Sequence, residues 1–315
     1  MEALMGKETF LLHGKVKQYE WEGVGSLSLK SFYSGQALYR VGTGAHLVND
    51  GCYLLLNHDQ PYALSVASER PIESFCIFFA RGVAEDVVRS LIIPDERLLD
   101  GPDSAASPVQ FFERTYPHDR LVSPLLFRLR AASRKQPLEP VWLQEQLHHL
   151  VEPLLQVHKQ TWREVEQLPA MKRSTREELY RRLLLARDYA AALFAAPLTL
   201  AELAQVACLS QNHFLRTFQA AFHQTPHQYL TARRLEAAQN LLRYTDRSVT
   251  EICFDVGFVS LGSFSSLFRQ KVGLSPETYR RQNQRHIGVK KGDFQEAAEH
   301  WWWHTFHMDE LERTS

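Results

Sequence analysis

Between residues 25 and 80 the hydrophobic positions follow the patterns of short β-strands. Leu27 and Leu29 alternate with polar neighbours, whereas residues 52–56 and 75–79 are unbroken apolar runs of strand length. Alternation is typical of a strand with one buried face, and an unbroken run is typical of a strand buried on both faces. Closely spaced Gly, Asn, Asp and Ser turn signals separate these runs. The pattern predicts an antiparallel sandwich or small barrel that can hold one small ligand.

From about residue 121 the spacing becomes helical. Between residues 139 and 168 the apolar residues recur every three or four positions, and Pro153 is expected to kink or divide this run. The stripe either packs on its own barrel or forms a seam between two subunits; we favour the seam, because a small barrel offers little partner surface. The stripe comprises Leu143, Leu147, Leu150, Leu154, Trp162 and Val165. Residues 168–175 are expected to form a linker.

The last third of the chain contains an internal repeat. A hydroxyl residue followed three positions later by glutamate occurs at Thr199 and Glu202, and 49 residues later at Ser248 and Glu251. This spacing is the capping box of a helix start. The positions that match beyond the turn are Phe214 and Phe264, Phe218 and Phe268, Pro226 and Pro276, and Tyr229 and Tyr279. Each unit is thus predicted to be a short capped helix, a tight turn and a second amphipathic helix, which is the helix-turn-helix arrangement.

The turn and the spacer of this repeat add geometric detail. Gly257 stands where the turn needs a left-handed backbone, and Cys208 takes that position in the first unit at a cost of roughly 1–2 kcal/mol. Residues 226–244 have no helix breaker after Pro226, so they predict one helix about 28 Å long. Such a spacer allows the two second helices to enter successive major grooves, about 34 Å apart.

Charge is distributed unevenly along the 315 residues, although 36 basic and 36 acidic side chains cancel overall. Residues 171–290 hold 17 basic and 9 acidic residues, a net charge of +8, and the remainder carries −8. A neutral chain would argue against binding nucleic acid, but this asymmetry indicates a basic module joined to an acidic one. The length predicts two domains.

Several classes of protein are disfavoured. No apolar run reaches the roughly 20 residues that span a bilayer, and no secretory signal is evident, so we expect a cytoplasmic chain without a membrane partner. The four cysteines are far apart, and His13, His46 and His58 lack the spacing of metal ligands, so no metal or other cofactor is expected. Neither a nucleophile motif nor a phosphate-binding glycine loop occurs, so no catalytic residue is assigned and the chain is not expected to be an enzyme.

The C-terminal part resembles the AraC/XylS family of bacterial transcription regulators. The resemblance is carried by LTLAELAQVACLSQNHFLRTFQAAF, RRLEAAQNLL and SVTEICFDVGFVSLGSFSSLFRQKVGLSPETYRR. It covers residues 183–281 densely, and the N-terminal part looks like the family's cupin-type effector and dimerisation domain. Two departures are His223, where the second unit keeps Gly273, and Ser266, where the family usually has a basic residue.

The resemblance implies a multidomain α+β protein. Its parts are an antiparallel, cupin-like β barrel (1–120), a helical dimerisation segment (121–168), an all-α double helix-turn-helix domain (169–286, with units at about 199–222 and 248–272) and a tail (287–315). The implied partners are double-stranded DNA with tandem half-sites, a small-molecule effector, RNA polymerase and a second copy of the chain. Two alternatives are a constitutive regulator whose barrel only dimerises, and a cupin-type enzyme with an accessory DNA-binding domain.

Residues opposite the repeated phenylalanines are the candidates for contact with DNA. The first unit offers Gln211, Asn212, His213, Arg216 and Thr217, and the second offers Leu261, Gly262, Ser263, Ser266 and Arg269. Arginine can grip guanine and amides can pair with adenine, whereas serines make no bidentate contact with a base. We therefore expect the first unit to supply most base discrimination and the second to dock mainly on the phosphate backbone.

The tail has an unusual aromatic density at residues 298–308. Three adjacent tryptophans cannot share one helix face, so the tail is either poorly ordered and without function or a segment that docks on the protein or stabilises a dimer.

Overall fold

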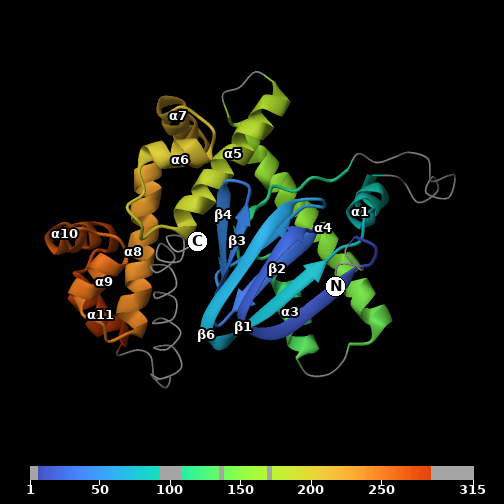
Figure 1. Ribbon diagram of the computed structural model, residues 1–315, viewed down its shortest axis with the longest axis horizontal. Helices are drawn as coiled ribbons and strands as arrows, with labels where there is room; N and C mark the ends of the chain where they lie inside the picture. The colour runs from blue at the N-terminus through green and yellow to red at the C-terminus, as the bar shows by residue number, and fades with distance from the viewer. Residues whose placement is uncertain (1–5, 93–107, 135–137, 169–171, 285–315) are drawn as a thin grey trace.

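The computed structural model describes residues 6–92, 108–134, 138–168 and 172–284. Its first part is a nearly closed antiparallel barrel, and its last part is wholly helical (Figure 1). The Trp-rich tail lies outside the described residues. In the described ranges no helix is both long and apolar enough to cross a membrane.

The barrel is built around one long central strand, β6 (Pro61–Phe78). On one side β6 pairs with β1 (Phe10–Val24), and on the other with β3 (Gln36–Val41) and β2 (Ser28–Tyr33). Outside these, β4 (Gly44–Asn49) pairs with β3, β5 (Cys52–Leu56) with β2, and β7 (Arg114–Pro117) with β5. The strands expected between residues 25 and 80 are confirmed; β1 and β7 went unpredicted.

The side chains of alternate residues in each strand pack into two separate hydrophobic cores. Phe32, Tyr39 and Leu54 point into the barrel. Leu29, Tyr53 and Phe75 point outward, where α1 (Val83–Ile92), α3 (Ser123–Ser133) and α4 (Pro140–Glu166) cover them. Such a division follows from the period of two in a β-strand.

The helix α4 decides between alternatives left open by the sequence. Of the kink or division expected at Pro153, division is wrong, because the helix continues through this residue. Its apolar stripe is covered within a single chain, since Leu147, Leu150 and Leu154 are at most 1% exposed and pack on the outer face of the barrel. The stripe is therefore not an open seam for a second subunit. The barrel offers more partner surface than expected, because its strands carry apolar side chains on both faces.

The next helix, α5 (Arg173–Ala192), links barrel and C-terminal region. It begins inside the stretch expected as a linker, and Leu168 is buried with Val165 and Tyr180, so 168–175 is not a linker throughout. One face of α5 packs on the barrel, where Leu185 lies against Gly44 at the start of β4. Another face of α5 carries Leu183 and Ala190, which pack in one hydrophobic core with the helices that follow.

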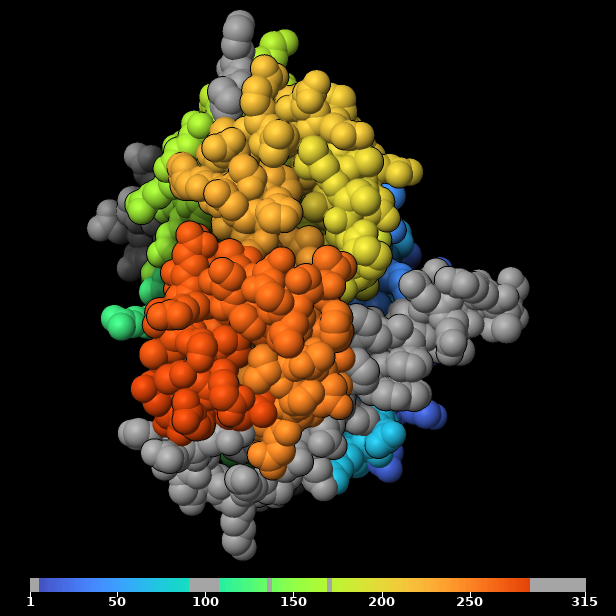
Figure 2. Space-filling view, turned by 90° about the vertical axis from the view of Figure 1, so that its left-hand side faces the viewer, coloured from blue at the N-terminus to red at the C-terminus, as the bar shows by residue number. Residues whose placement is uncertain are grey.

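The two repeated units lie at opposite ends of one helix, α8 (Pro226–Tyr244) (Figure 1). The first consists of α6 (Leu200–Val206) and α7 (Gln211–Phe222), and the second of α9 (Val249–Asp255) and α10 (Leu261–Val272), followed by α11 (Pro276–Gln284). Figure 2 shows both units on one face of the molecule. The predicted bounds of α8 are confirmed at both ends.

Candidate nucleic-acid interface

Both units begin with the expected reciprocal cap. The Thr199 backbone N–H donates to Glu202 Oε2 (2.6 Å), and the Glu202 N–H donates to Thr199 Oγ1 (3.2 Å). Ser248 and Glu251 repeat this arrangement at 2.7 and 3.1 Å. Hydrogen bonds from the hydroxyl and backbone N–H of the cap residue lower the pKa of each glutamate. At each helix start the box thus pairs two backbone N–H groups that have no partner within the helix.

The turns have the left-handed backbone that the repeat predicts. The φ angle is 51° at Cys208 and 87° at Gly257. At Gly257 space is also limited, because a Cβ atom would lie 2.5 Å from the carbonyl oxygen of Ala195. His223 and Gly273 both end their helices in the left-handed region, at 54° and 86°. His223 therefore replaces the glycine of the family pattern but keeps the left-handed backbone that ends the helix.

Paired phenylalanines orient the second helix of each unit. The rings of Phe214 and Phe218 in α7 are 5.3 Å apart, and those of Phe264 and Phe268 in α10 are 5.6 Å apart. All four side chains are buried. Because one face of each helix is fixed in the core, the opposite face is held toward solvent.

Nine of the ten predicted contact residues are exposed on these opposite faces, namely Gln211, Asn212, His213, Arg216, Leu261, Gly262, Ser263, Ser266 and Arg269. Thr217 is the exception. It is 5% exposed, and its hydroxyl donates to the His213 carbonyl (2.7 Å), so it does not lie on this surface. Thr217 directly precedes Phe218 and shares its buried side of the helix.

One exposed residue was missed by the sequence reasoning. Val259 is 95% exposed, in the turn that leads to Leu261 at the start of α10. Apolar side chains can contact the methyl group of thymine in the major groove. The sequence did offer a sign of this, because Val259 is an apolar residue in a turn, a position where packing does not call for one.

A family model described as a helix-turn-helix domain matches residues 203–282. This part of the chain is an AraC-type helix-turn-helix domain. Three curated relatives match segments of this chain: the probable transcriptional regulator LumQ of Photobacterium leiognathi (37% identity over 82 residues), the melibiose operon regulatory protein of Escherichia coli (37% over 87) and the transcriptional activator RhaS of Escherichia fergusonii (47% over 57). These matches cover 26%, 28% and 18% of this chain.

The matched segments cover only 33%, 29% and 20% of those relatives, respectively. Among solved structures, the DNA-binding domain of AdpA in complex with a target DNA is 28% identical, with 35% of this chain and 98% of that chain covered and a TM-score of 0.33. ToxT from Vibrio cholerae is 12% identical, with 88% and 99% covered and a TM-score of 0.32.

The barrel is in direct contact with the AraC-type domain through α5. His46 of β4 lies against Asp188 of α5, which also accepts hydrogen bonds from the backbone and hydroxyl of Thr115 in β7 (2.7 and 3.1 Å). The guanidinium of Arg187 bonds the other oxygen of Asp188 (2.9 Å) and lies over the ring of Phe222 in α7. The contacts of Asp188 with the barrel and with Arg187 went unpredicted, and the available signal was a charged pair inside an otherwise apolar helical stretch.

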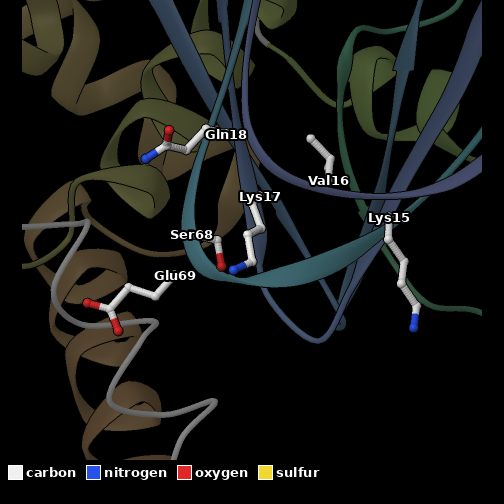
Figure 3. A pocket seen from close by; sticks show the side chains of 6 residues that line it. All are labelled: Lys15, Val16, Lys17, Gln18, Ser68 and Glu69. Atoms are coloured by element: carbon white, nitrogen blue, oxygen red, sulfur yellow. The ribbon is translucent and has the colours of Figure 1, made fainter.

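The barrel holds a second candidate site, a partly open cavity of about 290 Å³. Strands β1, β2, β3 and β6 line it, chiefly with aromatic and aliphatic side chains that include Trp21, Phe32, Tyr39, Tyr62 and Phe78. An outer hollow adjoins it at the register shift between β1 and β6, where Lys17, Gln18, Ser68 and Glu69 line it (Figure 3). The two spaces share Lys15 and Val16 as lining residues. In the described ranges, no three His, Cys, Asp or Glu side chains gather as metal ligands.

Proposed function

We propose that this protein is a sequence-specific, DNA-binding transcription regulator that acts in the cytoplasm and responds to a small molecule in its barrel. The observation that carries the proposal is the pair of exposed helices α7 and α10, held at the two ends of α8 by buried phenylalanines. The 19 residues of α8 span about 28 Å, close to one turn of duplex. Tandem half-sites about one helical turn apart fit this spacing.

Within this proposal the two units divide the recognition. Arg216 can bond the major-groove edge of guanine, and Gln211 or Asn212 that of adenine. On α10, Leu261, Ser263 and Ser266 are short or apolar, so this helix contacts mainly phosphates, together with Arg269 and the backbone N–H groups at its start.

The interior cavity favours a barrel that binds an effector over one that only dimerises. Small-molecule sites are typically apolar cavities of about 300–1,000 Å³, and this one lies close to the lower limit. An effector would act through α5, since His46 and Thr115 of the barrel share Asp188 with that helix. A coupling of about 1–3 kcal/mol is sufficient for such regulation. The proposed regulator forms a homodimer and contacts RNA polymerase. The apolar stripe of α4 is not assigned to the dimer interface, because it packs on the barrel of its own chain.

The proposal is tested by selecting binding sites from a random duplex library with the full-length protein, then measuring affinity by fluorescence anisotropy. We expect an enriched two-part site bound at least roughly 10³-fold more tightly than random duplex at physiological salt. The double variant Arg216→Ala/Arg269→Ala should lose most of this affinity, and Lys159→Ala, an exposed residue of α4, should retain it. Failure to enrich any sequence would refute the proposal.

A further inference from the structure

Lys30 occupies an unusual position, because its side chain points into the barrel. It lies in β2 directly opposite Cys76 of β6, and it is only 2% exposed. It is also one of the residues that line the interior cavity. Lysine is almost never fully buried unless its charge is paired.

The structure gives this ammonium group little compensation. In the described part of the chain, no hydrogen bond or ion pair to Lys30 Nζ is found, and none of the described residues lining the cavity is acidic. The Nζ atom lies 3.6 Å from the centroid of the Phe78 ring and 5.4 Å from that of Tyr62. A desolvated cation–π contact contributes about 2 kcal/mol or somewhat more, which offsets only part of the several kcal/mol lost on burying an ion.

The amine of Lys30 stays mostly protonated at neutral pH although it is buried. Desolvation lowers its pKa to about 8, against a weaker opposing effect of Cys76, so the amine is still mostly charged at neutral pH. Burial also raises the pKa values of Tyr39 and Tyr62, which line the same cavity and keep their hydroxyl protons. The polar groups of the cavity therefore include a buried cation and two neutral tyrosine hydroxyls, set among chiefly apolar walls.

We propose that the barrel binds a small apolar monocarboxylate whose carboxylate accepts a charge-assisted hydrogen bond from Lys30. The hydrocarbon part would pack among the aromatic walls. An apolar cavity of about 150 Å³ already holds benzene, so 290 Å³ accommodates a simple aromatic or short-chain acid. Lys15 of β1 also lines both spaces, but its side chain extends away from the outer hollow (Figure 3).

This inference rests on the proposed effector role of the barrel and names the class of ligand. Its test is isothermal titration of the full-length protein with straight-chain carboxylates from butanoate to decanoate, benzoate and 3-phenylpropanoate, each compared with its primary amide. We expect at least one acid to bind roughly 10- to 100-fold more tightly than its amide. Lys30→Met should abolish this preference, while Lys15→Met, which removes an exposed lysine of β1, should keep most of it.

Three results would overturn the inference: no acid binding at concentrations up to about 1 mM, equal affinity for acid and amide, or an unchanged preference in Lys30→Met. The comparison of acid with amide uses the wild-type protein, so it stands even if a variant fails to fold. Affinity of the same preparation for its selected duplex is measured separately. Loss of specific DNA binding would count against the proposed function, whereas failure of acid binding alone would leave DNA recognition standing.

Discussion

His46 Nδ1 lies 2.9 Å from Asp188 Oδ2, joining a barrel strand to the helix that leads into the DNA-binding domain. Both side chains are at most 1% exposed. Burial by itself raises the pKa of Asp188, but the charge of Arg187 and the hydrogen bond from His46 hold that pKa well below its ordinary value. Asp188 is therefore charged at neutral pH, and it pairs with groups from both parts of the molecule.

Asp188→Asn should destabilise the fold strongly. The substitution removes the carboxylate that pairs with Arg187 and leaves a buried guanidinium without its counter-charge, which typically costs about 3–5 kcal/mol. Urea denaturation at pH 7 measures the loss. Asp86→Asn, which breaks the largely exposed pair with Arg89 on α1, is the matched control and should cost under about 1 kcal/mol. Equal losses in the two variants would contradict this role.

Lys30→Met should stabilise the protein in the absence of ligand. The pKa of Lys30 is about 8 when folded and 10.5 at its ordinary value, so the unfolded chain binds the proton more tightly. The 2.5-unit difference corresponds to a cost of about 3 kcal/mol at pH 7, from which the variant should recover about 1–3 kcal/mol.

The same linkage predicts the pH dependence. Between pH 8 and 10.5 the folded protein releases the Lys30 proton first, so this residue contributes an increase in stability as pH rises. Denaturant titrations across this range should show the wild type approaching the Lys30→Met variant. A gap that stays constant with pH would show that Lys30 does not titrate as described.

Gly257→Ala and Gly273→Ala separate backbone strain from steric clash. Both glycines have a left-handed backbone, with φ angles of 87° and 86°. A Cβ atom at Gly273 meets nothing within 4 Å, so we expect a cost of about 1–2 kcal/mol from strain alone. At Gly257 it would collide with the Ala195 carbonyl, and the cost should exceed that by at least about 1 kcal/mol. Thermal unfolding of both variants measures the difference, and equal losses would exclude the clash.

Arg216→Ala and Ser263→Ala test the proposed division between the two units. Loss of a bidentate contact with guanine should cost about 1–3 kcal/mol and relax the preference at one position of the site. Loss of a phosphate contact by Ser263 should weaken all sequences by a similar factor. Anisotropy titrations against the selected site and its single-base variants distinguish these outcomes. The division is wrong if Arg216→Ala leaves binding unchanged while Ser263→Ala relaxes the preference.

The sequence by itself determined the elements whose signals are local. Capping residues, the turn at Gly257, the paired phenylalanines and the uninterrupted run of α8 each act within a few turns of helix, so their spacing predicts the structure. The strands between residues 25 and 80 were predictable for the same reason. The exposed faces of α7 and α10 could be predicted from the buried phenylalanines. Thr217 is the exception, because it is buried and its hydroxyl donates a hydrogen bond to a carbonyl of its own helix.

Tertiary structure decided which surfaces meet. The strand β1 was not predicted because it is rich in polar residues and is held by pairing with β6, whose partner residues lie 37 to 68 positions further along the chain. The stripe on α4 could pack on a barrel or on a second subunit, and hydrophobic spacing does not distinguish these partners. His46 and Asp188 are separated by 142 residues. Periodicity indicates that a side chain will be buried, but only the folded chain determines what lies against it, as with Lys30 inside the barrel.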